Sequence, residues 1–187
     1  MASAFAHAVV PLVVYAAFKS PSMNLRLLVL AIILAIAPDA DVLAFKFGIA
    51  YSSEWGHRGF THSLFFAGCV AAFFMLFAKP LKSKPWVVFA MSFIACASHA
   101  ALDALTNGGL GVALYWPFST ERVFFPFRPV QVSPIGVGAF FTERGLRVIT
   151  SEFVWIFIPG FVIGLLGVLI RRKITARKPA IGDGQEA

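Results

Sequence analysis

Apolar residues occur in five long runs along the chain, and segments richer in polar residues separate them. A helix needs about 20 residues to cross the hydrocarbon core of a bilayer, or about 17 at the short end. The last three runs reach that length and the first two fall short of it. The pattern predicts an all-α membrane protein with about five transmembrane helices, over residues 3–18, 24–38, 60–78, 85–105 and 151–170.

The segment between the last two runs, residues 106–150, has a different pattern. It contains six glycines and four prolines among many aromatic residues. Glycine and proline break long helices, yet the segment is too apolar for a solvated linker. We therefore predict a cap of turns and short strands on the outer membrane surface, within a single membrane domain that comprises residues 1–187.

Composition also indicates a membrane protein. Of the 187 residues, 59% are hydrophobic and 13% are charged, and the mean hydropathy is +0.81; soluble domains carry roughly 25% charged residues. A secretory signal peptide is the competing interpretation of residues 1–20, but no Lys or Arg precedes their apolar run. Cys69 and Cys96 lie within apolar runs, where a thiol behaves as a small hydrophobic group, so they predict no disulfide framework.

The distribution of charge predicts how the chain faces. The net charge is +7, but the basic residues are scattered between the runs rather than gathered on an aromatic-rich basic face, so we predict no nucleic acid partner. If all five runs cross, most Lys and Arg residues fall on the side of the connections after the first and third runs and of the C-terminal tail. That side is cytoplasmic by the positive-inside rule. The N-terminus and the cap then face outward, and residues 171–187 form a disordered basic tail in the cytoplasm.

Ionisable residues gather at the outward ends of the predicted helices. All four histidines of the chain belong to this set, with most acidic residues of the first 160 positions. In a bundle, helix ends lie side by side, so residues distant in the sequence can share one pocket. The set comprises His7, Asp39, Asp41, His57, His62, His99, Asp103 and Glu152.

Two pairs within this set have a spacing typical of metal ligands. His99 and Asp103 stand at i and i+4 of a predicted helix, so their side chains share one face, which Thr106 continues. An imidazole and a carboxylate on one helix face form a frequent half-site for a divalent metal. Asp39 and Asp41, in the string PDAD, present alternate carboxylates from an extended segment after a proline that ends the second run. Carboxylates so near a bilayer are costly unless they are paired or bound to a metal.

Each member of the set also has a structural alternative. His7 could be an interfacial histidine, and the i, i+4 pair could form a plain hydrogen bond that ties a helix end. The two aspartates of PDAD could be helix-stop and turn residues. Glu152 could be an N-terminal charge that the helix dipole favours, and Arg58 could neutralise one of the two aspartates. Separate explanations of this kind leave the common level of these residues unexplained.

The order of these strings resembles that of a known family. A histidine near the N-terminus, PDAD, HRGFTHS and HAALDALTNGG follow one another at similar spacing in a bacterial family of membrane-bound metal-dependent hydrolases, a domain of unknown function. The resemblance covers roughly residues 5–160, and HRGFTHS is its most specific part. It implies a location in the bacterial inner membrane. It also implies metal ligation by Asp39, Asp41, His57, His62, His99 and Asp103, with Arg58 and Thr61 at the basic and hydroxyl positions of the family.

The resemblance and the ligand types together predict a chemistry. The family is distantly similar to the zinc-dependent phospholipase C group, which implies phosphoester hydrolysis on a helical scaffold. Aspartate and histidine ligands without cysteine suit zinc first, and also manganese or iron, as one ion or two. A divalent ion lowers the pKa of its bound water towards 7, while Arg58 could clamp a phosphate and Thr61 could add a donor. The candidate catalytic residues are Arg58, Thr61, His62 and Glu152.

A site at the outer ends of the helices constrains the substrate. A lipid can keep its tails in the bilayer there while its head group reaches the metal. We therefore predict a membrane-embedded hydrolase that cleaves a phosphoester or similar bond of a lipid or amphiphile. The first alternative is a non-catalytic, metal-stabilised membrane scaffold, whose site would lack an open coordination position. The second is a transporter, which would need ionisable groups near the bilayer midplane.

Two further points complete the predictions. Serine catalysis by Ser63 or Ser98 beside a histidine lacks the strand and the sharp elbow that such a nucleophile uses. The bilayer and the lipid or amphiphilic substrate are the predicted partners. The sequence does not indicate an oligomeric state.

Overall fold

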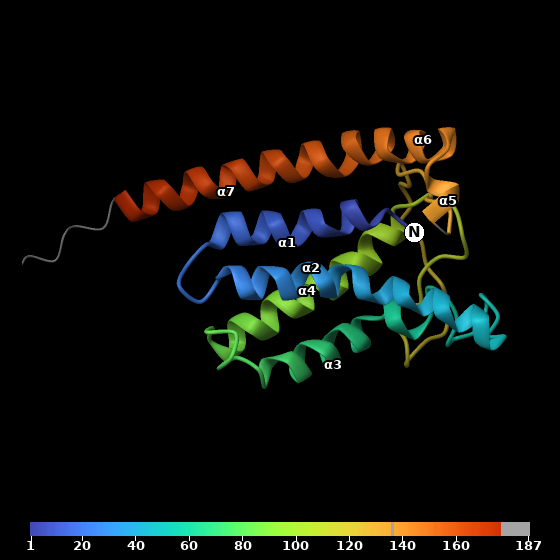
Figure 1. The fold of residues 1–187 in the computed structure, drawn as a ribbon, viewed down its shortest axis with the longest axis horizontal. Helices are drawn as coiled ribbons and strands as arrows, with labels where there is room; N and C mark the ends of the chain where they lie inside the picture. The colour runs from blue at the N-terminus through green and yellow to red at the C-terminus, as the bar shows by residue number, and fades with distance from the viewer. Residues whose placement is uncertain (136, 177–187) are drawn as a thin grey trace, which may run out of the picture.

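The helices of the protein run alongside one another and place most of their connections at two opposite ends (Figure 1). The structure, a computed structural model, describes residues 1–135 and 137–176. Within these residues the regular elements are helical, which confirms the all-α fold class. In chain order they are α1 (Ala4–Phe18), α2 (Leu25–Ile36), η1 (Ala37–Phe47), η2 (Phe60–His62), α3 (Leu64–Met75), α4 (Pro85–Ala104), α5 (Val137–Phe140), α6 (Glu143–Glu152), η3 (Phe153–Phe157) and α7 (Ile158–Ala176).

Three helical stretches are long and apolar enough to cross a membrane. They are Leu25–Phe47, Pro85–Ala104 and Glu143–Ala176, of 23, 20 and 34 residues. The apolar helices Ala4–Phe18 and Leu64–Met75 are shorter. At 1.5 Å per residue, α1 is about 22 Å long, whereas the hydrocarbon core is about 30 Å thick. Each of the five predicted spans overlaps a helix of the structure. Because two of these helices are short, five full crossings of the membrane remain a prediction.

Local signals set where the helices begin. The side chain of Asn24 accepts hydrogen bonds from two N–H groups in the first turn of α2, and that of Ser63 accepts one from Phe66 in α3. Such caps satisfy N–H groups that have no partner within the helix. Pro85 stands at the start of α4, where its missing N–H needs no partner. Because Ser63 directly follows His62, the start of α3 also fixes the position of that histidine.

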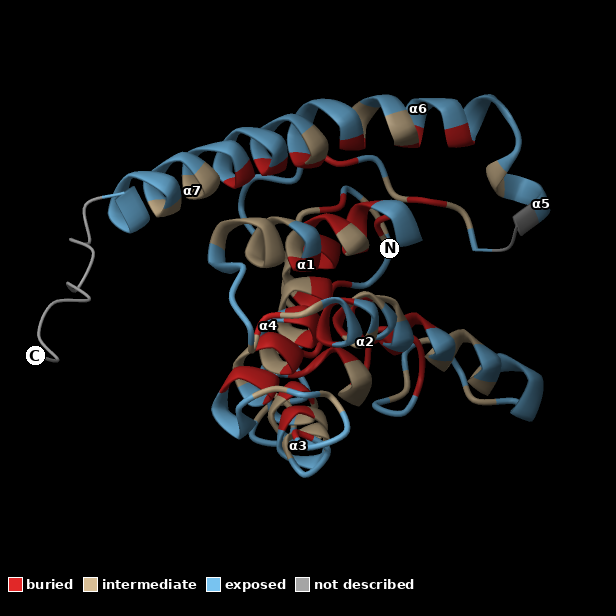
Figure 2. Cartoon of the chain, turned by 60° about the vertical axis from the view of Figure 1, so that its left-hand side comes forward, coloured by how far each residue is buried: buried red, intermediate tan, exposed pale blue. Residues whose placement is uncertain are grey.

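The bundle has α4 near its centre and α7 at its edge. Residues of α2, α3 and α4 form one apolar core, in which Leu27, Val88 and Met91 are buried. α7 packs on α1 through glycines, and a Cβ atom added to Gly160 would lie 2.5 Å from the Cγ1 atom of Val9. Small residues let membrane helices approach closely in this way. Most of the remaining surface of α7 is exposed (Figure 2), as expected for a face that contacts lipid.

The chain remains helical after α2. It continues as the 3-10 helix η1, with Pro38 in its first turn, and ends at Gly48, whose φ of 74° is a conformation that favours glycine. Proline is tolerated in a first helical turn because its missing N–H would have no partner there. The prediction that Asp39 and Asp41 lie in an extended segment was therefore wrong. The two carboxylates instead lie within one turn of a 3-10 helix, where residues two apart point in different directions.

The segment that links α4 to α6 covers the end of the bundle that holds the N-terminus (Figure 1). In the part of this segment that the structure describes, the expected short strands are reduced to two isolated bridges, Thr106 with Val130 and Val112 with Val123. The helical part also begins earlier than predicted, because α6 starts at Glu143 and continues through η3 into α7. The buried positions of α6 are spaced three and four residues apart, as in an amphipathic helix.

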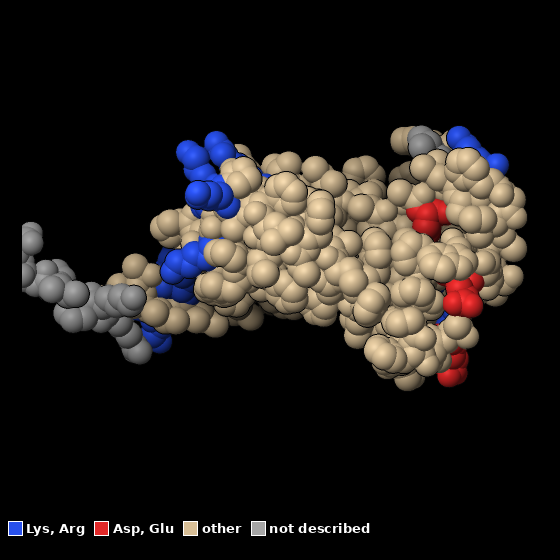
Figure 3. Space-filling model, turned by 90° about the horizontal axis from the view of Figure 1, so that it is seen from below, with Lys and Arg blue, Asp and Glu red and all other residues tan. Residues whose placement is uncertain are grey.

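Charged side chains are divided unequally between the two ends of the bundle. Figure 3 shows most Lys and Arg at one end and the Asp and Glu of this face towards the other. The basic end holds the α1–α2 and α3–α4 connections and the last turns of α7. The positive-inside rule associates such an end with the cytoplasm, and the orientation itself remains a prediction. Residues 171–176 of the predicted tail are helical, and residues 177–187 lie outside the described residues.

Candidate metal centre

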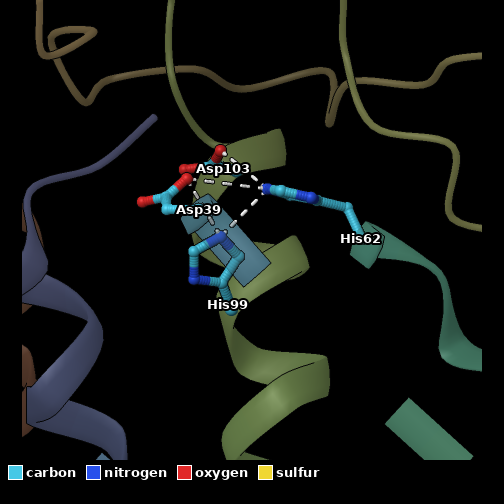
Figure 4. Close-up of side chains that lie close together, drawn as sticks. All are labelled: Asp39, His62, His99 and Asp103. Carbon is cyan, nitrogen blue, oxygen red and sulfur yellow. Dashed lines mark hydrogen bonds and ion pairs between the residues drawn. The ribbon is translucent and has the colours of Figure 1, made fainter. Parts of the chain in front are cut away.

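Four buried side chains that commonly bind metals meet near the end of the bundle that holds the N-terminus (Figure 4). Asp39 comes from η1, His62 from η2, and His99 and Asp103 from α4. Asp39 is 8% exposed and the other three residues are 1% exposed or less. Each residue offers one ligand atom, and the four atoms lie within 4.8 Å of one another. Segments distant in the sequence thus supply one cluster, which we call the four-residue cluster.

The separations between these atoms suit a metal ion. The Nε2 atoms of His62 and His99 are 2.9 Å apart, and the Oδ1 atom of Asp39 lies 3.4 Å from His99 Nε2 and 3.8 Å from His62 Nε2. The Oδ2 atom of Asp103 is 3.6 Å from His62 Nε2. A tetrahedral ion with bonds of about 2.0–2.1 Å separates its ligands by about 3.3–3.4 Å. The observed distances fall on either side of that value.

Two oxygens of the cluster lack hydrogen bonds. Asp39 Oδ1 and Asp103 Oδ2 are buried and have no hydrogen-bond partner among the described residues. Arg58 Nε lies 2.9 Å from Asp103 Oδ2, but the direction of its N–H does not make a hydrogen bond, so this contact is an ion pair only. Buried carboxylates without donors are costly, whereas a coordinated ion would satisfy them. The residues present therefore fit a divalent ion.

Hydrogen bonds orient both histidine rings of the cluster. His99 Nδ1 lies 2.7 Å from the carbonyl oxygen of Ala35, which makes Nδ1 the donor and leaves Nε2 as an acceptor. His62 Nδ1 lies 3.0 Å from Thr61 Oγ1, whose hydroxyl donates to Asp41 Oδ2, so Nδ1 is the donor to Thr61 and Nε2 is again left as an acceptor. Metal-binding histidines almost always donate their second N–H to such a partner. The geometry thus prepares the two Nε2 atoms for a ligand.

Asp41 and His57 lie behind His62 rather than among the four ligands. Asp41 Oδ1 is 2.6 Å from His57 Nδ1, and Asp41 Oδ2 accepts hydrogen bonds from Thr61 Oγ1 at 2.7 Å and from the backbone N–H of Arg58 at 3.1 Å. Both carboxylate oxygens of Asp41 therefore already have donors. Asp41, His57 and His62 also form a second group with ligand-type spacing. Asp41 therefore positions His62 through the hydroxyl of Thr61, and its Oδ2 atom also lies 3.3 Å from His62 Nδ1.

Arg58 is buried and its donors point at the protein. Beside the ion pair with Asp103, Nη1 donates to the carbonyl oxygen of Gly108 at 2.8 Å and Nη2 donates to Thr106 Oγ1 at 3.0 Å. Its φ of 65° is a backbone conformation that residues other than glycine seldom adopt, and strain of this kind is found at functional sites. Arg58 therefore connects Asp103 to the turn that follows α4. Its predicted role as a phosphate clamp remains a prediction.

The remaining predicted residues lie at two other places. His7 stacks on His99, with ring centroids 3.8 Å apart, and its Nε2 atom lies near Asp39 Oδ2 and Asp103 Oδ1. Glu152 accepts hydrogen bonds from the backbone N–H and the hydroxyl of Ser3, at the start of α1, and is not one of the clustered ligand donors. An acid at a helix N-terminus is favoured by the helix dipole. The carboxylate of Glu152 therefore lies at the N-terminus of α1, and not at the N-terminus of the helix that carries it.

Tyr51 and Arg122 are two residues that the sequence did not indicate. Arg122 donates to the carbonyl oxygens of Tyr51, Ser53 and His57, at 3.0, 2.8 and 2.8 Å, and so ties the segment after α4 to the loop before η2. Burial lowers the pKa of the Arg122 guanidinium from its ordinary value. A lone arginine in an aromatic segment carries no local signal of such partners.

A pocket of about 380 Å³ lies beside the site. Tyr51, His57, Gly109 and Arg144 are among the residues that line it. Gly109 has a φ of +89°, and a Cβ atom there would lie 2.6 Å from the Tyr51 hydroxyl and 2.7 Å from Arg58 Nη1. Glycine therefore permits the close approach of backbone to these two side chains. The pocket is thus lined by His57, which contacts Asp41, and also by the basic side chain of Arg144 from α6.

The fold and the cluster define a helical protein with membrane-spanning character and a buried group of possible metal ligands. The chain matches the family described as YdjM inner membrane protein over residues 1–174, and it belongs to that family. It is 40% identical over 177 residues to Inner membrane protein YbcI of Escherichia coli (strain K12), and the match covers 92% of this chain and 99% of the relative. No solved structure matches the chain. Both descriptions state a location in the inner membrane, and neither states an activity.

Proposed function

We propose that this protein is a membrane-embedded metal-dependent hydrolase whose ion is bound by the four-residue cluster. One observation carries the proposal: Asp39 Oδ1 and Asp103 Oδ2, which face the imidazole nitrogens of the cluster, are buried without hydrogen bonds. Four ligand atoms at suitable separations, two of them otherwise unsatisfied, are better explained by an ion than by a plain polar network.

The donor set favours zinc as the ion. Two imidazole nitrogens and two carboxylate oxygens, with no sulfur, suit zinc and also manganese or iron, whereas magnesium and calcium prefer oxygen alone. When bound, a divalent ion supplies Lewis-acid activation of water near neutral pH. The cysteines lie elsewhere, since Cys96 contacts the carbonyl oxygen of Leu34 and Cys69 is exposed.

Each neighbouring residue then has a positioning task. Thr61 holds the ring of His62 through its hydroxyl, which donates to Asp41, and His57 contacts the other oxygen of that carboxylate. Arg58 holds Asp103 through its ion pair and excludes water from that side by its own burial. Such supporting contacts matter to metal sites nearly as much as the ligands themselves.

The surroundings favour an amphiphilic substrate with an anionic group. The pocket beside the site is lined by His57 and Arg144, and α6, which carries Arg144, continues into the exposed apolar surface of α7. A lipid could place its tails along such a surface while its head group enters the pocket. A lipid or amphiphilic phosphoester, cleaved on the extracytoplasmic side of the membrane, fits this arrangement best.

A metal-stabilised scaffold is the second candidate function. The observation that favours it is the number of ligands, because four protein ligands fill a tetrahedral site and structural zinc sites are closed in this way. The two functions differ in turnover and not in metal content. An assay of hydrolysis therefore separates them.

The test uses the full chain purified in detergent. We expect a divalent metal near one ion per chain or more, and hydrolysis of a lipid phosphoester or of bis(p-nitrophenyl) phosphate that a chelator abolishes. His99→Ala should lose both. Ser98→Ala is the matched control, because this neighbouring hydroxyl only donates to the carbonyl oxygen of Ala95.

The outcomes separate the candidate functions clearly. Metal without turnover on any phosphoester of the panel would leave the scaffold and contradict the hydrolase. Full metal content in His99→Ala would contradict the site itself. Loss of metal in Ser98→Ala as well would show that the loss does not report on ligation by His99.

A further inference from the structure

His7 lies beside the four-residue cluster and stacks on the ring of His99. It is fully buried on α1, and its Nε2 atom lies 3.6 Å from Asp103 Oδ1 and 3.8 Å from Asp39 Oδ2. These are the second oxygens of the two carboxylates whose first oxygens face His62 and His99. Asp39 and Asp103 thus each place one oxygen near the histidines of the cluster and the other oxygen near His7.

The imidazole of His7 has no hydrogen bond among the described residues. Both of its ring nitrogens are buried without a partner. The contacts of 3.6 and 3.8 Å with the two carboxylates are too long for hydrogen bonds. A neutral imidazole carries one donor and one acceptor, and burial of both without partners is costly. A cation between His7 and the aspartates would remove this cost for the nitrogen that faces them.

We propose that a second divalent ion binds between His7 Nε2, Asp39 Oδ2 and Asp103 Oδ1, so that the two aspartates bridge two ions. The proposal rests on the function proposed above, because it places this ion next to the ion of the four-residue cluster. The separations of 3.6 and 3.8 Å are close to the spacing of about 3.3–3.4 Å between ligands of a tetrahedral ion. Two-ion hydrolytic sites hold their ions about 3.5–4 Å apart.

The second ion also explains how a site with four ligands can be catalytic. The four-residue cluster fills a tetrahedron, whereas His7 and the two aspartates supply three ligands only. Catalytic ions keep a position open for water or substrate, and structural ions do not. The ion with the open coordination position is therefore the second ion, which His7 binds. Paired ions of this kind are typical of phosphoester hydrolysis.

Two neighbouring groups compete with this ion without excluding it. The backbone N–H of Ala2 donates to Asp103 Oδ1 at 2.6 Å, and the amino group of Met1 lies 4.0 Å from Asp103 Oδ2. A carboxylate oxygen has two lone pairs, so Asp103 Oδ1 can accept this hydrogen bond and still coordinate. Arg58 and this amino group lie within ion-pair distance of Asp103, whereas the contacts of Asp39 within that distance are with histidines.

The test is metal stoichiometry, with His7→Phe as the variant. Phenylalanine keeps an aromatic ring that can stack on His99 but offers no ligand atom. Protein is loaded with manganese, freed of excess metal, and measured by elemental analysis and electron paramagnetic resonance. We expect two ions per chain with a spin-coupled signal in the wild type, and one ion with an uncoupled six-line signal in His7→Phe.

Ser92→Ala is the matched control. Ser92 Oγ is likewise buried without a hydrogen-bond partner, but it lies seven residues before His99 on α4, about 10 Å along the helix axis. This control should keep two ions. His7→Leu, which also offers no ligand atom, is a second variant in case His7→Phe does not fold, and it should also bind one ion.

The results distinguish failure of this proposal from failure of the proposed function. One ion in the wild type and one in both His7 variants would overturn the second ion and leave the hydrolase standing. Two ions in a folded His7→Phe would also overturn the assignment of His7. No ion in the wild type would overturn both.

Discussion

α4 and the continuous helix that ends in α7 are both apolar, but they lie in opposite environments. Both are long and apolar enough to cross a membrane. Of the most apolar 18 consecutive residues of each helix, 61% are buried in α4 and 11% are buried in Glu143–Ala176. The buried face of α4 carries His99 and Asp103, whereas the buried residues of α7 are Gly160 and Gly164 (Figure 2).

The difference shows what hydropathy does and does not reveal about a membrane helix. Hydropathy identifies both helices, but the polar residues at one end of α4 indicate that this helix lies inside the bundle. An ionisable side chain in a membrane segment is costly unless it faces protein or water. η3 and α7 have no ionisable residue from Phe153 to Ile170, and their large apolar side chains are free to face lipid. The first helix supports a site and the second supplies an anchor.

The largest expected effect is on α4. Asp103→Ala leaves the guanidinium of Arg58 buried without its charge partner, and loss of one member of a buried ion pair costs about 3–5 kcal/mol. Denaturant unfolding in detergent should show this loss of stability. Glu143→Ala removes a carboxylate from an exposed i, i+4 pair on α6 and should change stability little. Equal losses in the two variants would contradict the contrast between the helices.

An intermediate effect is expected where α7 meets α1. Gly160→Leu adds a side chain at a point where even a Cβ atom would lie 2.5 Å from Val9 Cγ1. Overpacking of this kind costs about 1–3 kcal/mol. Metal content should remain at the wild-type level, because α7 supplies no ligand. Gly68→Leu on α3 is the matched control, since nothing lies within 4 Å of a Cβ atom there. Loss of metal in Gly160→Leu would show that α7 is not merely an anchor.

The smallest effect is expected on the outer face of α7. Phe161 is 71% exposed, and substitution of such surface residues usually changes stability by about 0.5 kcal/mol or less. Phe161→Ala should therefore unfold in detergent at nearly the same denaturant concentration as the wild type and bind the same amount of metal. A loss of several kcal/mol would mean that this face packs against protein.

Much of the fold follows from local patterns and could therefore be predicted. Each of the five apolar runs coincides with a helix because hydropathy and caps such as Asn24 and Ser63 act within a few residues. The pairing of His99 with Asp103 on one face follows from helix geometry alone. Their proximity to Asp39 and His62 could be expected from the common level of these residues at the helix ends.

Other features depend on contacts between distant segments and could not be predicted. The choice of Asp39 for the four-residue cluster, with Asp41 behind His62, depends on the tight turn of η1. Glu152 accepts a hydrogen bond from Ser3, which is 149 positions away in the sequence. The residues around Glu152 in α6 do not indicate that partner. The burial of Arg58 likewise depends on the turn after α4, whose oxygens accept its hydrogen bonds.

X-ray absorption at the metal K edge of the purified, metal-loaded protein tests the central claim most directly. If the four-residue cluster binds the ion, the zinc spectrum should show only nitrogen and oxygen neighbours at about 2.0–2.2 Å, with the outer-shell scattering of imidazole rings. That scattering should fall in His99→Ala and not in Ser98→Ala. A sulfur shell at about 2.3 Å, or a spectrum without imidazole scattering, would contradict the assignment of the site.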